Sequence, residues 1–317
     1  MKSNLDYTGF HFKNQTGFYK GKVRDVYWAI DKIILIASDR ISAFDHVLPQ
    51  TIPFKGQVLN QISAFFLRQT KHIAPNWFET SPDPNVSVGI SCIPIRLEMV
   101  VRGYLTGHAW RVYQTGERMI CGVRMPDGMK ENDPFPYPII TPALKADEGH
   151  DEDISREEIL SKGILPESDY RLLEKYSLDL FAFGTQKARE RGLILVDTKY
   201  EFGKSGDQIM LIDEVHTPDS SRYFYLDGYQ ERQDRGEKQK QLSKEFVREW
   251  LIAEGFQGKE GQRVPDLSGE MVQQITDRYI HLYELITGEN FDRVFSENIL
   301  DRVEKNVQKY LDTVSVL

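Results

Sequence analysis

Alternation between charged and uncharged positions marks one segment of the chain as a two-faced β-strand. In VDTKYEF (196–202), Asp197, Lys199 and Glu201 are each separated by one uncharged residue. Successive side chains of a strand point to opposite faces, so the three charged residues share one face. The segment GKSGD predicts a hairpin turn directly after it, which brings Asp213 near the same face on the returning strand.

This charged face has two interpretations. Carboxylates that converge beside a lysine suit a magnesium ion bound to phosphate oxygens, because magnesium prefers one or two carboxylates plus waters and substrate oxygens. The alternative is a ladder of cross-strand ion pairs on a solvated face. Acidic residues that follow the apolar runs in LILVD and IMLID favour the metal site.

Elsewhere the hydrophobic pattern predicts mainly strands in the first 100 residues. The segments VRDVYWAI and KIILIAS predict a hairpin joined at Asp31-Lys32, and a helix is expected to begin near Gly56. The apolar stretch ISCIPIRLEMVVRGYLTG is interrupted by Pro94. We interpret it as a strand followed by a crossing between lobes near Arg96–Met99.

From residue 155 the pattern becomes helical. Ser155, followed three residues later by Glu158, predicts a capping box at a helix start. Gly192 is expected to end a long amphipathic helix, and three more amphipathic helices are predicted in the C-terminal part of the chain.

Composition restricts the class of protein. A chain of 317 residues suits two domains or one bilobal unit. The net charge of -8 argues against broad nucleic-acid binding, although a local basic pocket can still hold a small anion. Two cysteines are too few for a disulfide framework or a zinc site. With no secretory signal and no apolar window long enough to span a bilayer, we expect a cytoplasmic protein with no membrane partner.

Two N-terminal segments have side chains suited to small-molecule chemistry. YKGKVRDVY (19–27) places a glycine with Lys22 and Arg24 at a strand entry, where backbone and ammonium groups can lie over phosphates. A solvated basic turn is the alternative, and no Walker A motif is present. In SDRISAFDHVLP (38–49), Asp39 and Asp45 either line a ligand loop or form turns and caps.

Three later segments contain further candidates. Arg102 lies in an apolar run, so it needs a partner anion, which is either an internal carboxylate or a ligand phosphate. Lys145 ends an apolar stretch and is followed by Asp147 and Asp151, in a run that otherwise resembles a solvated charged loop. Arg222, in HTPDSSRY, is a candidate anion clamp.

Six blocks together resemble one family. GKVRDVY, SDRISAFD, LEMVVRGYLTG, LKADEGHD, LILVDTKYEFG and IDEVHTPDSSRY occur in the order and spacing of the phosphoribosylaminoimidazole-succinocarboxamide synthase (SAICAR synthetase) family, over about residues 19–230. The resemblance implies a ligase of purine biosynthesis. With ATP, it would join L-aspartate to the carboxylate of carboxyaminoimidazole ribonucleotide (CAIR) through an acyl phosphate, giving SAICAR, ADP and phosphate.

The resemblance also implies an α+β, bilobal, ATP-grasp-like fold with ATP in the cleft. Residues 1–97 would form a small β-rich nucleotide-binding lobe. Residues 98–317 would form a larger α+β lobe for substrate and metal, with a helical extension from about residue 237. The expected partners are small molecules only, and the sequence contains no signal for an oligomeric state.

Matching positions receive roles by resemblance. The resemblance implies Lys22, Arg24 and Lys199 at the ATP phosphates; Met99 at the adenine hinge; Arg102 and Arg222 at the CAIR 5'-phosphate, with His108 where a serine is usual; Lys145, Asp147 and Asp151 around the imidazole carboxylate and its metal; Glu201 and Asp213 as Mg²⁺ ligands; and Lys199, Lys145 and Asp197 as the catalytic group. The reaction also needs a loop that handles aspartate, and we assign Asp39 or Asp45 to it.

Two rival functions share some of these features. A small-molecule or inositol-phosphate kinase would share the lobes and metal carboxylates, but the chain has neither H-R-D-x-x-x-x-N nor D-F-G. A nucleotide-binding protein without turnover would lose metal or lysine residues, whereas Lys199, Glu201 and Asp213 are all present.

Overall fold

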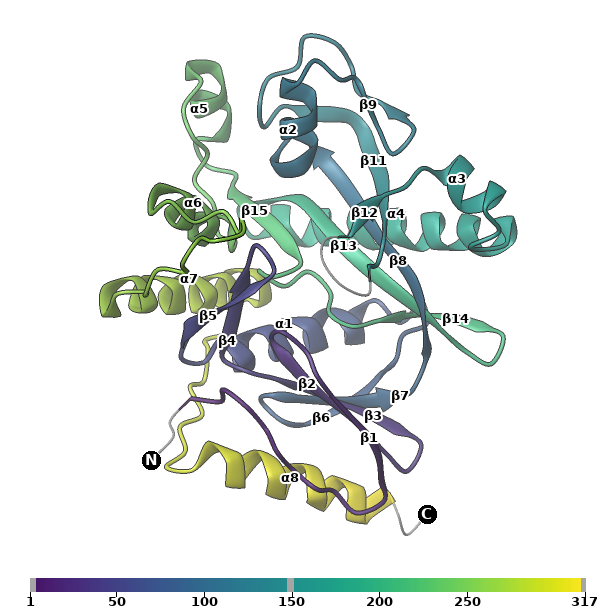
Figure 1. Cartoon of the computed structure of the whole chain (residues 1–317), viewed down its shortest axis with the longest axis vertical. Helices are drawn as coiled ribbons and strands as arrows, with labels where there is room; N and C mark the ends of the chain where they lie inside the picture. The colour runs from purple at the N-terminus through teal and green to yellow at the C-terminus, as the bar shows by residue number, and fades with distance from the viewer. Residues whose placement is uncertain (1–3, 147–150, 315–317) are drawn as a thin grey trace. The chain divides into compact units, whose positions relative to one another are not determined.

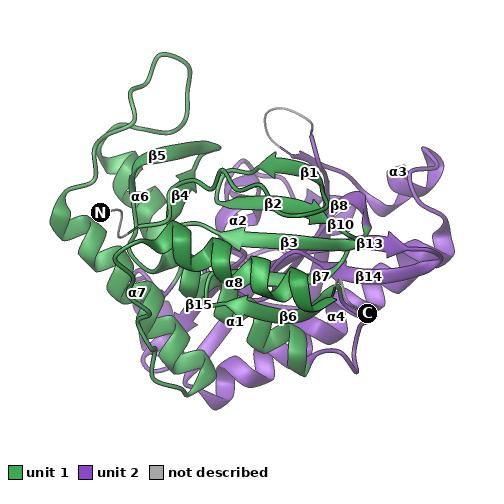
Figure 2. Ribbon diagram, turned by 90° about the horizontal axis from the view of Figure 1, so that it is seen from below, with its two compact units in different colours: residues 1–69, 77–92, 243–317 green, residues 70–76, 93–242 purple. Residues whose placement is uncertain are grey.

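The computed structural model describes residues 4–146 and 151–314, and the chain forms two compact units. Unit 1 comprises residues 1–69, 77–92 and 243–317, and unit 2 comprises residues 70–76 and 93–242 (Figure 2). This division differs from the expected lobes, because the C-terminal helices group with the N-terminal strands and not with the second lobe.

A five-stranded antiparallel sheet with the strand order β1-β2-β3-β7-β6 forms the centre of unit 1 (Figure 1). Its strands are β1 (Gln15–Lys20), β2 (Arg24–Ala29), β3 (Lys32–Ala37), β6 (Phe78–Asp83) and β7 (Val86–Ile90), beside a separate pair, β4 (Arg40–Ala43) and β5 (His46–Thr51). The predicted β2–β3 hairpin is confirmed. Its loop is Ile30-Asp31, one residue earlier than predicted, because Ile30 turns the chain at φ 60° and Ala29 pairs with Lys32.

Four helices complete unit 1. They are α1 (Lys55–Gln69), α6 (Glu245–Ala253), α7 (Gly269–Thr287) and α8 (Ile299–Val314). The predicted helix near Gly56 and the three C-terminal helices are confirmed. Helix α7 packs on α1, and α8 packs beside β6 with Val303 and Val307 buried in the same cluster as Tyr27 and Ile34. This burial of apolar side chains explains why the C-terminal helices belong with the N-terminal strands.

Unit 2 is built on a six-stranded sheet with the order β12-β11-β8-β13-β14, in which β15 also pairs with β13. Its elements are β8 (Ile93–Tyr104), β11 (Pro134–Leu144), β12 (Glu152–Asp153), β13 (Leu193–Ser205), β14 (Gln208–Ile212), β15 (Ser221–Tyr225), the small pair β9 (Met119–Ile120) and β10 (Val123–Arg124), and the helices α2 (Gly107–Gln114), α3 (Arg156–Ser161), α4 (Glu167–Glu190) and α5 (Tyr229–Arg235). The capping box of Ser155 and Glu158 is confirmed at the start of α3.

Strand β8 corrects one sequence-based expectation. It runs without interruption from Ile93 to Tyr104, so the crossing predicted near Arg96–Met99 is absent and the unit boundary falls at residue 92. Pro94 is tolerated because β11 begins to pair with β8 only at Leu97. Before that point one side of β8 has no strand ladder for a missing amide N–H to break.

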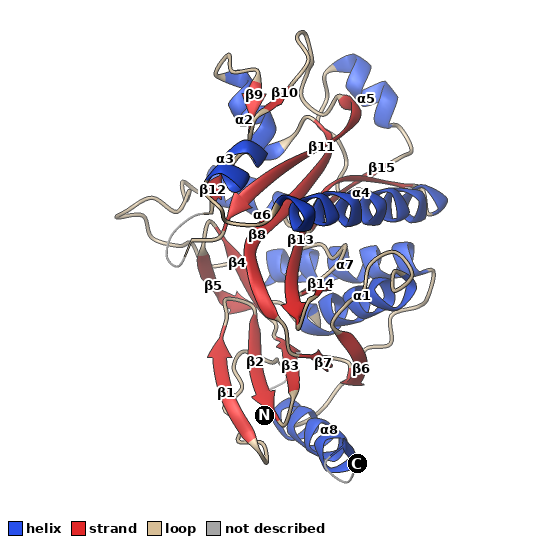
Figure 3. Cartoon of the chain, turned by 90° about the vertical axis from the view of Figure 1, so that its right-hand side faces the viewer, coloured by secondary structure: helices blue, strands red, loops and turns tan. Residues whose placement is uncertain are grey.

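Helix α4 covers the uncharged face of the unit 2 sheet and packs on β13 and β8 (Figure 3). On that face Tyr200 is fully buried, and its hydroxyl lies 2.5 Å from Nε2 of His216. The backbone of α4 comes so close that a Cβ on Gly184 would lie 2.0 Å from the His216 ring. Burial lowers the pKa of His216 to about 3, so the imidazole is neutral in the folded protein.

Buried His216 predicts acid sensitivity of the fold. An unfolded histidine has a pKa of about 6.5, so between about pH 6.5 and 3 the unfolded chain binds a proton that the folded chain does not. Stability is therefore lost on acidification, with a slope of about 1.4 kcal/mol per pH unit from this residue. His216→Asn, a side chain that tolerates the observed φ of 57°, should make urea-derived stability fall less steeply with acidification by that amount.

The buried carboxyl of Asp39 titrates in the same range with the opposite sign. Burial raises the pKa of Asp39 to about 6, so this carboxyl contributes stability that is lost as the pH rises towards 6. Its contribution is common to wild type and variant and cancels in the difference between their slopes. Equal slopes in the two proteins would show that His216 takes up its proton in the folded state.

Candidate active site

The register of the unit 2 sheet builds one continuous charged face. Glu201 on β13 lies opposite Glu98 on β8, and Asp197 lies opposite both Arg102 on β8 and Arg222 on β15. The alternation predicted for 196–202 is thus present, with the uncharged residues buried on the side of α4. The charged side chains form two groups, one around Lys199 and one around Asp197.

In the first group lysines and glutamates alternate in space. Nζ of Lys199 lies 2.5 Å from Oε1 of Glu98 and 3.9 Å from Oε1 of Glu201. Nζ of Lys145 lies 2.7 Å from Oε2 of Glu201. Burial alone would lower the pKa of Lys199, but the charges of Glu98 and Glu201, with a smaller contribution from Asp213, raise it above its ordinary value. Lys199 is therefore a fixed positive charge.

Glu98, the closest acidic partner of Lys199, is not among the site residues predicted from the sequence. The signal was available, because Glu98 stands in the same apolar run as Arg102, at an even spacing that places both on one face of a strand. A charge inside an apolar strand requires a partner, and this holds for Glu98 as it does for Arg102.

The carboxylates of this group are compatible with a hard divalent cation. Glu98 and Glu201 face each other directly across two strands, where like charges repel unless a cation lies between them. Asp213 follows β14 immediately, at φ 59°. Within residues 4–146 and 151–314 no group of three or more His, Cys, Asp or Glu side chains is arranged for metal binding. Two carboxylates nevertheless suffice for magnesium when phosphate oxygens and water complete its shell.

The second group joins two arginines through one carboxylate. Oδ2 of Asp197 accepts a hydrogen bond from Nη1 of Arg222 and lies 3.6 Å from Nη1 of Arg102. Nε of Arg102 donates to Oγ1 of Thr141 at 2.8 Å. Arg102 therefore has an internal carboxylate as partner, which was one of the two possibilities left open by the sequence. Two guanidinium groups and one carboxylate leave this group of three with one net positive charge.

Helix α2 begins beside the Arg222 guanidinium. Gly107 is its first residue, at φ 56°, and a Cβ at this position would lie 2.5 Å from Nη2 of Arg222. Only glycine allows this approach. The start of a helix, with its free amide N–H groups, and a guanidinium together favour binding of an anion.

Replacing Gly107 by alanine tests this arrangement. The added methyl group must displace Arg222, so we expect the apparent KM for the substrate bound there to rise roughly tenfold, the usual loss when one charge-assisted hydrogen bond is misplaced. Gly116→Ala is the matched control, because Gly116 also has positive φ (95°) but no atom lies within 4 Å of the place that its Cβ would take. Equal effects of the two variants in steady-state kinetics would show that backbone strain, and not Arg222, is responsible.

Two further predicted residues of unit 2, His108 and Asp151, form hydrogen bonds of their own. Nε2 of His108 is 2.6 Å from Oδ2 of Asp153, and this hydrogen bond lowers the pKa of the Asp153 carboxyl. Oδ1 of Asp151 accepts a hydrogen bond from the amide of Ala146 at 3.2 Å. Asp147 lies outside the described residues.

In unit 1, the turn that contains Gly21 and Lys22 is hydrogen-bonded to Arg40, an arginine that is not among the predicted site residues. Arg40 donates from Nε to the Lys22 carbonyl at 3.0 Å and from Nη2 to the Gly21 carbonyl at 3.0 Å. Its guanidinium is anchored by the buried carboxylate of Asp25 at 2.7 Å. The side chain of Lys22 is exposed and pairs with Oδ1 of Asp45 at 2.5 Å.

Two predicted site residues, Asp39 and Met99, are buried in the interior of the protein. Asp39 is 2% exposed, and its two carboxylate oxygens accept hydrogen bonds from the amides of Leu5 (2.8 Å) and Gly56 (2.9 Å). Asp39 therefore links the start of α1 to the N-terminal segment around Leu5. The predicted role of Asp39 in handling aspartate is wrong. Met99 is fully buried and pairs with Tyr200 on the α4 side of β8, so the predicted adenine hinge is corrected as well.

Comparison with known proteins shows the family to which the chain is similar. The family model described as SAICAR synthetase matches residues 17–264. A phosphoribosylaminoimidazole-succinocarboxamide synthase from Cytophaga hutchinsonii is 63% identical over 304 residues, covering 96% of this chain and 98% of the relative. A synthase of the same name from Bacteroides thetaiotaomicron is 60% identical, covering 97% of this chain and 98% of the relative.

The chain belongs to the SAICAR synthetase family. Membership confirms the resemblance seen in the six sequence blocks, and with it the ligase activity in purine biosynthesis. Among solved structures, the SAICAR synthase from Saccharomyces cerevisiae, complexed with SAICAR, matches with a TM-score of 0.75 and 30% identity, covering 92% of this chain and 99% of that chain. The predicted α+β SAICAR synthetase fold is thereby confirmed. No helix among the described residues is long and apolar enough to cross a membrane.

Proposed function

We propose that this chain joins L-aspartate to the carboxylate of CAIR, with ATP converting that carboxylate to an acyl phosphate. The observation that carries the proposal is the single sheet face of unit 2, on which Lys199 lies between two glutamates while Arg102 and Arg222 share one aspartate. Family membership supplies the reaction, and this face supplies residues suited to its charges. The cytoplasmic location expected from the sequence is part of the proposal.

The Arg102–Asp197–Arg222 group is proposed to bind the 5'-phosphate of CAIR. Its net positive charge attracts a phosphate, and the free amides at the start of α2 add donors beside Arg222. Asp197 would then act as a positioning residue that holds both guanidinium groups, rather than as the catalytic residue expected from the sequence. His108, held by Asp153, is proposed as a neighbour of this phosphate.

Lys199 and Lys145 are proposed to act on the reacting groups. The fixed charge of Lys199 would stabilise negative charge on the phosphoryl group during transfer. Lys145, with Asp147 and Asp151 close in the sequence, would hold the imidazole carboxylate. In unit 1, Lys22 and Arg24 would neutralise nucleotide phosphates at the turn that Arg40 supports.

Magnesium would be held by Glu201 and Asp213, as expected from the sequence, together with Glu98. A bound magnesium ion would offset charge on the nucleotide phosphates. Lys199 and Lys145 neutralise the same glutamates in this structure, so they would exchange these partners for phosphate and carboxylate oxygens when substrates bind.

The reaction consists of two displacements. A carboxylate oxygen of CAIR attacks the γ-phosphorus of ATP, and the bond to ADP breaks. The aspartate amine, after losing its ammonium proton, attacks the acyl carbon, so that an amide bond forms and phosphate leaves with the electrons of the C–O bond. The protein mainly positions three anionic substrates and offsets their repulsion.

The test is ADP release from Mg-ATP, with CAIR and aspartate added singly and together. Release that requires both substrates, with formation of the succinocarboxamide, supports the proposal. ADP release in the presence of hydroxylated acceptors, but not with CAIR and aspartate, would overturn it in favour of a kinase.

A further inference from the structure

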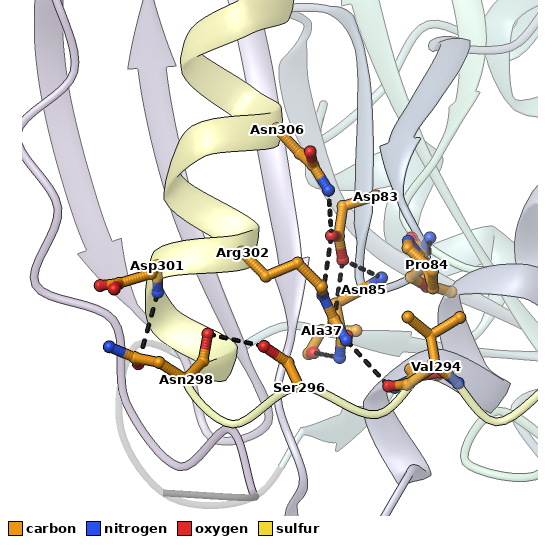
Figure 4. Close-up of polar contacts among 12 residues, drawn as sticks. Ala37, Asp83, Pro84, Asn85, Val294, Ser296, Asn298, Asp301, Arg302 and Asn306 are labelled. Atoms are coloured by element: carbon orange, nitrogen blue, oxygen red, sulfur yellow. Dashed lines mark hydrogen bonds and ion pairs between the residues drawn. The ribbon is translucent and has the colours of Figure 1, made fainter. Parts of the chain in front are cut away.

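The C-terminal helix α8 is tied to a turn of the unit 1 sheet by one arginine. The guanidinium of Arg302 donates from Nε to Oδ2 of Asp83 at 3.1 Å and from Nη2 to Oδ1 of Asp83 at 3.2 Å (Figure 4). It also donates to Oδ1 of Asn85 at 2.6 Å and to the carbonyl of Val294 at 2.9 Å. Asn306, one turn along α8, adds a hydrogen bond to Asp83 at 2.7 Å.

The turn that Arg302 holds is itself bonded to the end of β3. The Asp83 side chain has no exposed surface, and its Oδ1 accepts a hydrogen bond from the Asn85 amide at 2.9 Å. The Asn85 side chain donates to the Ala37 carbonyl at 3.0 Å, while the Ala37 amide donates to the Asn85 carbonyl at 2.8 Å (Figure 4). These two bonds fix Ala37 from both sides.

The next residue carries the connection to the glycine-containing turn. Both the amide and the hydroxyl of Ser38 donate to the Val23 carbonyl, at 3.0 Å and 2.8 Å. Val23 directly follows Lys22, the residue proposed to contact nucleotide phosphates. An unbroken series of hydrogen bonds and short backbone steps therefore runs from α8 to that turn, entirely within unit 1.

Close packing around Ala37 and Asn85 limits how far these hydrogen-bonded residues can move. A Cβ on Gly56, in the first turn of α1, would lie 2.2 Å from the Ala37 carbonyl oxygen and 2.6 Å from Nδ2 of Asn85. The segment before α8 is attached to α1 as well, since Gln57 exchanges two hydrogen bonds with the backbone of Val294, at 2.9 Å and 3.2 Å. A close-packed interior transmits a displacement instead of absorbing it.

We propose that Arg302 is a positioning residue for the phosphate-binding turn around Lys22, acting through Asp83, Asn85, Ala37 and Ser38. The C-terminal extension thereby sets nucleotide affinity, without touching the nucleotide. This proposal rests on the proposed function only in assigning nucleotide phosphates to the Lys22 turn.

The experiment compares dissociation constants for Mg-ADP, measured by calorimetry, in the full-length wild type and four full-length variants. Arg302→Met should raise the constant about fivefold, in the range found for residues that couple through a packed network. Arg302→Lys keeps the charge but loses the bidentate fork, so a smaller rise is expected. Lys305→Met removes an exposed lysine of the same helix and should change nothing. The two Arg302 variants should also raise KM for ATP but not for CAIR or aspartate, and Lys305→Met should leave all three KM values unchanged.

Val303→Ala separates positioning from stability. Val303 is fully buried on α8, so its truncation loosens the helix without touching the Arg302 contacts. An unchanged dissociation constant for Mg-ADP in the folded Arg302 variants overturns the proposal. A rise in this constant that is equally large in Val303→Ala also overturns it. If Arg302→Met does not fold, the constant measured for Arg302→Lys is judged by the same two criteria. Failure of the wild type to make SAICAR would overturn the proposed reaction alone, because the dissociation constants need no turnover. Absence of Mg-ADP binding by the wild type would overturn both.

Discussion

Replacement of Lys199 by alanine is expected to abolish measurable turnover, a loss of roughly a thousandfold or more, while the protein remains folded. Lys199 is the fixed positive charge between Glu98 and Glu201 on the face proposed for phosphoryl transfer. Its loss would leave the developing charge on the transferred group unbalanced. The side chain is 34% exposed, so its removal opens little of the core. It also leaves Glu98 and Glu201 facing each other with Lys145 as the remaining neighbouring cation, so the melting temperature should fall measurably although the protein stays folded.

Lys204→Ala provides the control for this experiment. Lys204 lies on the same strand and forms an ion pair of the same length, 2.5 Å, with Asp169. Its loss removes an equal charge and a similar contact, outside the charged groups of the proposed site. Turnover should stay within about twofold of wild type, as for most surface substitutions. Wild-type activity in folded Lys199→Ala would refute the assignment of Lys199.

The second large effect is expected at Arg222. Arg222→Ala removes one of the two guanidinium groups on Asp197 and the one that lies against Gly107. We expect the apparent KM for CAIR to rise by roughly a hundredfold, because the charge-assisted contact proposed between Arg222 and the 5'-phosphate would be lost in a largely buried position. The KM for ATP should change far less. Steady-state kinetics with each substrate varied in turn measures the ratio.

Arg235→Ala is a suitable control, since Arg235 is an exposed arginine of the same unit that approaches only Glu237, at 3.9 Å, among the ion pairs of the described residues. It should leave both KM values unchanged. An equal rise in KM for CAIR and ATP in Arg222→Ala would place Arg222 outside the CAIR site.

Much of the local structure follows from the order of the residues. The hairpins, the capping box at Ser155 and the C-terminal helices were predictable because their signals lie within a few residues of each other. The two-faced character of 196–202 was predictable for the same reason. The family resemblance extended this to Arg102, Lys199 and Arg222, which the structure places on one sheet, and to Lys145, which directly follows β11 and pairs with Glu201 of that sheet.

Errors arose where a short-range signal was outweighed by a distant contact. Pro94 suggested a break, but β8 continues because β13 pairs with it from a position about 100 residues later in the chain. Asp39 was assigned to a substrate loop, and only the folded chain shows the amides of Leu5 and Gly56 bonded to it. Met99 was placed at a hinge, although the strand register turns it towards α4.

The family, the reaction and the strand that carries Lys199 could be predicted from the order of the residues alone, because periodicity and the six blocks are properties of neighbouring residues. Which charges meet depends on the folded chain. Glu98 and Lys199 are 101 residues apart, and Arg302 lies 219 residues from Asp83. Such pairings depend on strand register and helix packing, which are fixed by the burial of apolar side chains over the whole unit and not by any local pattern.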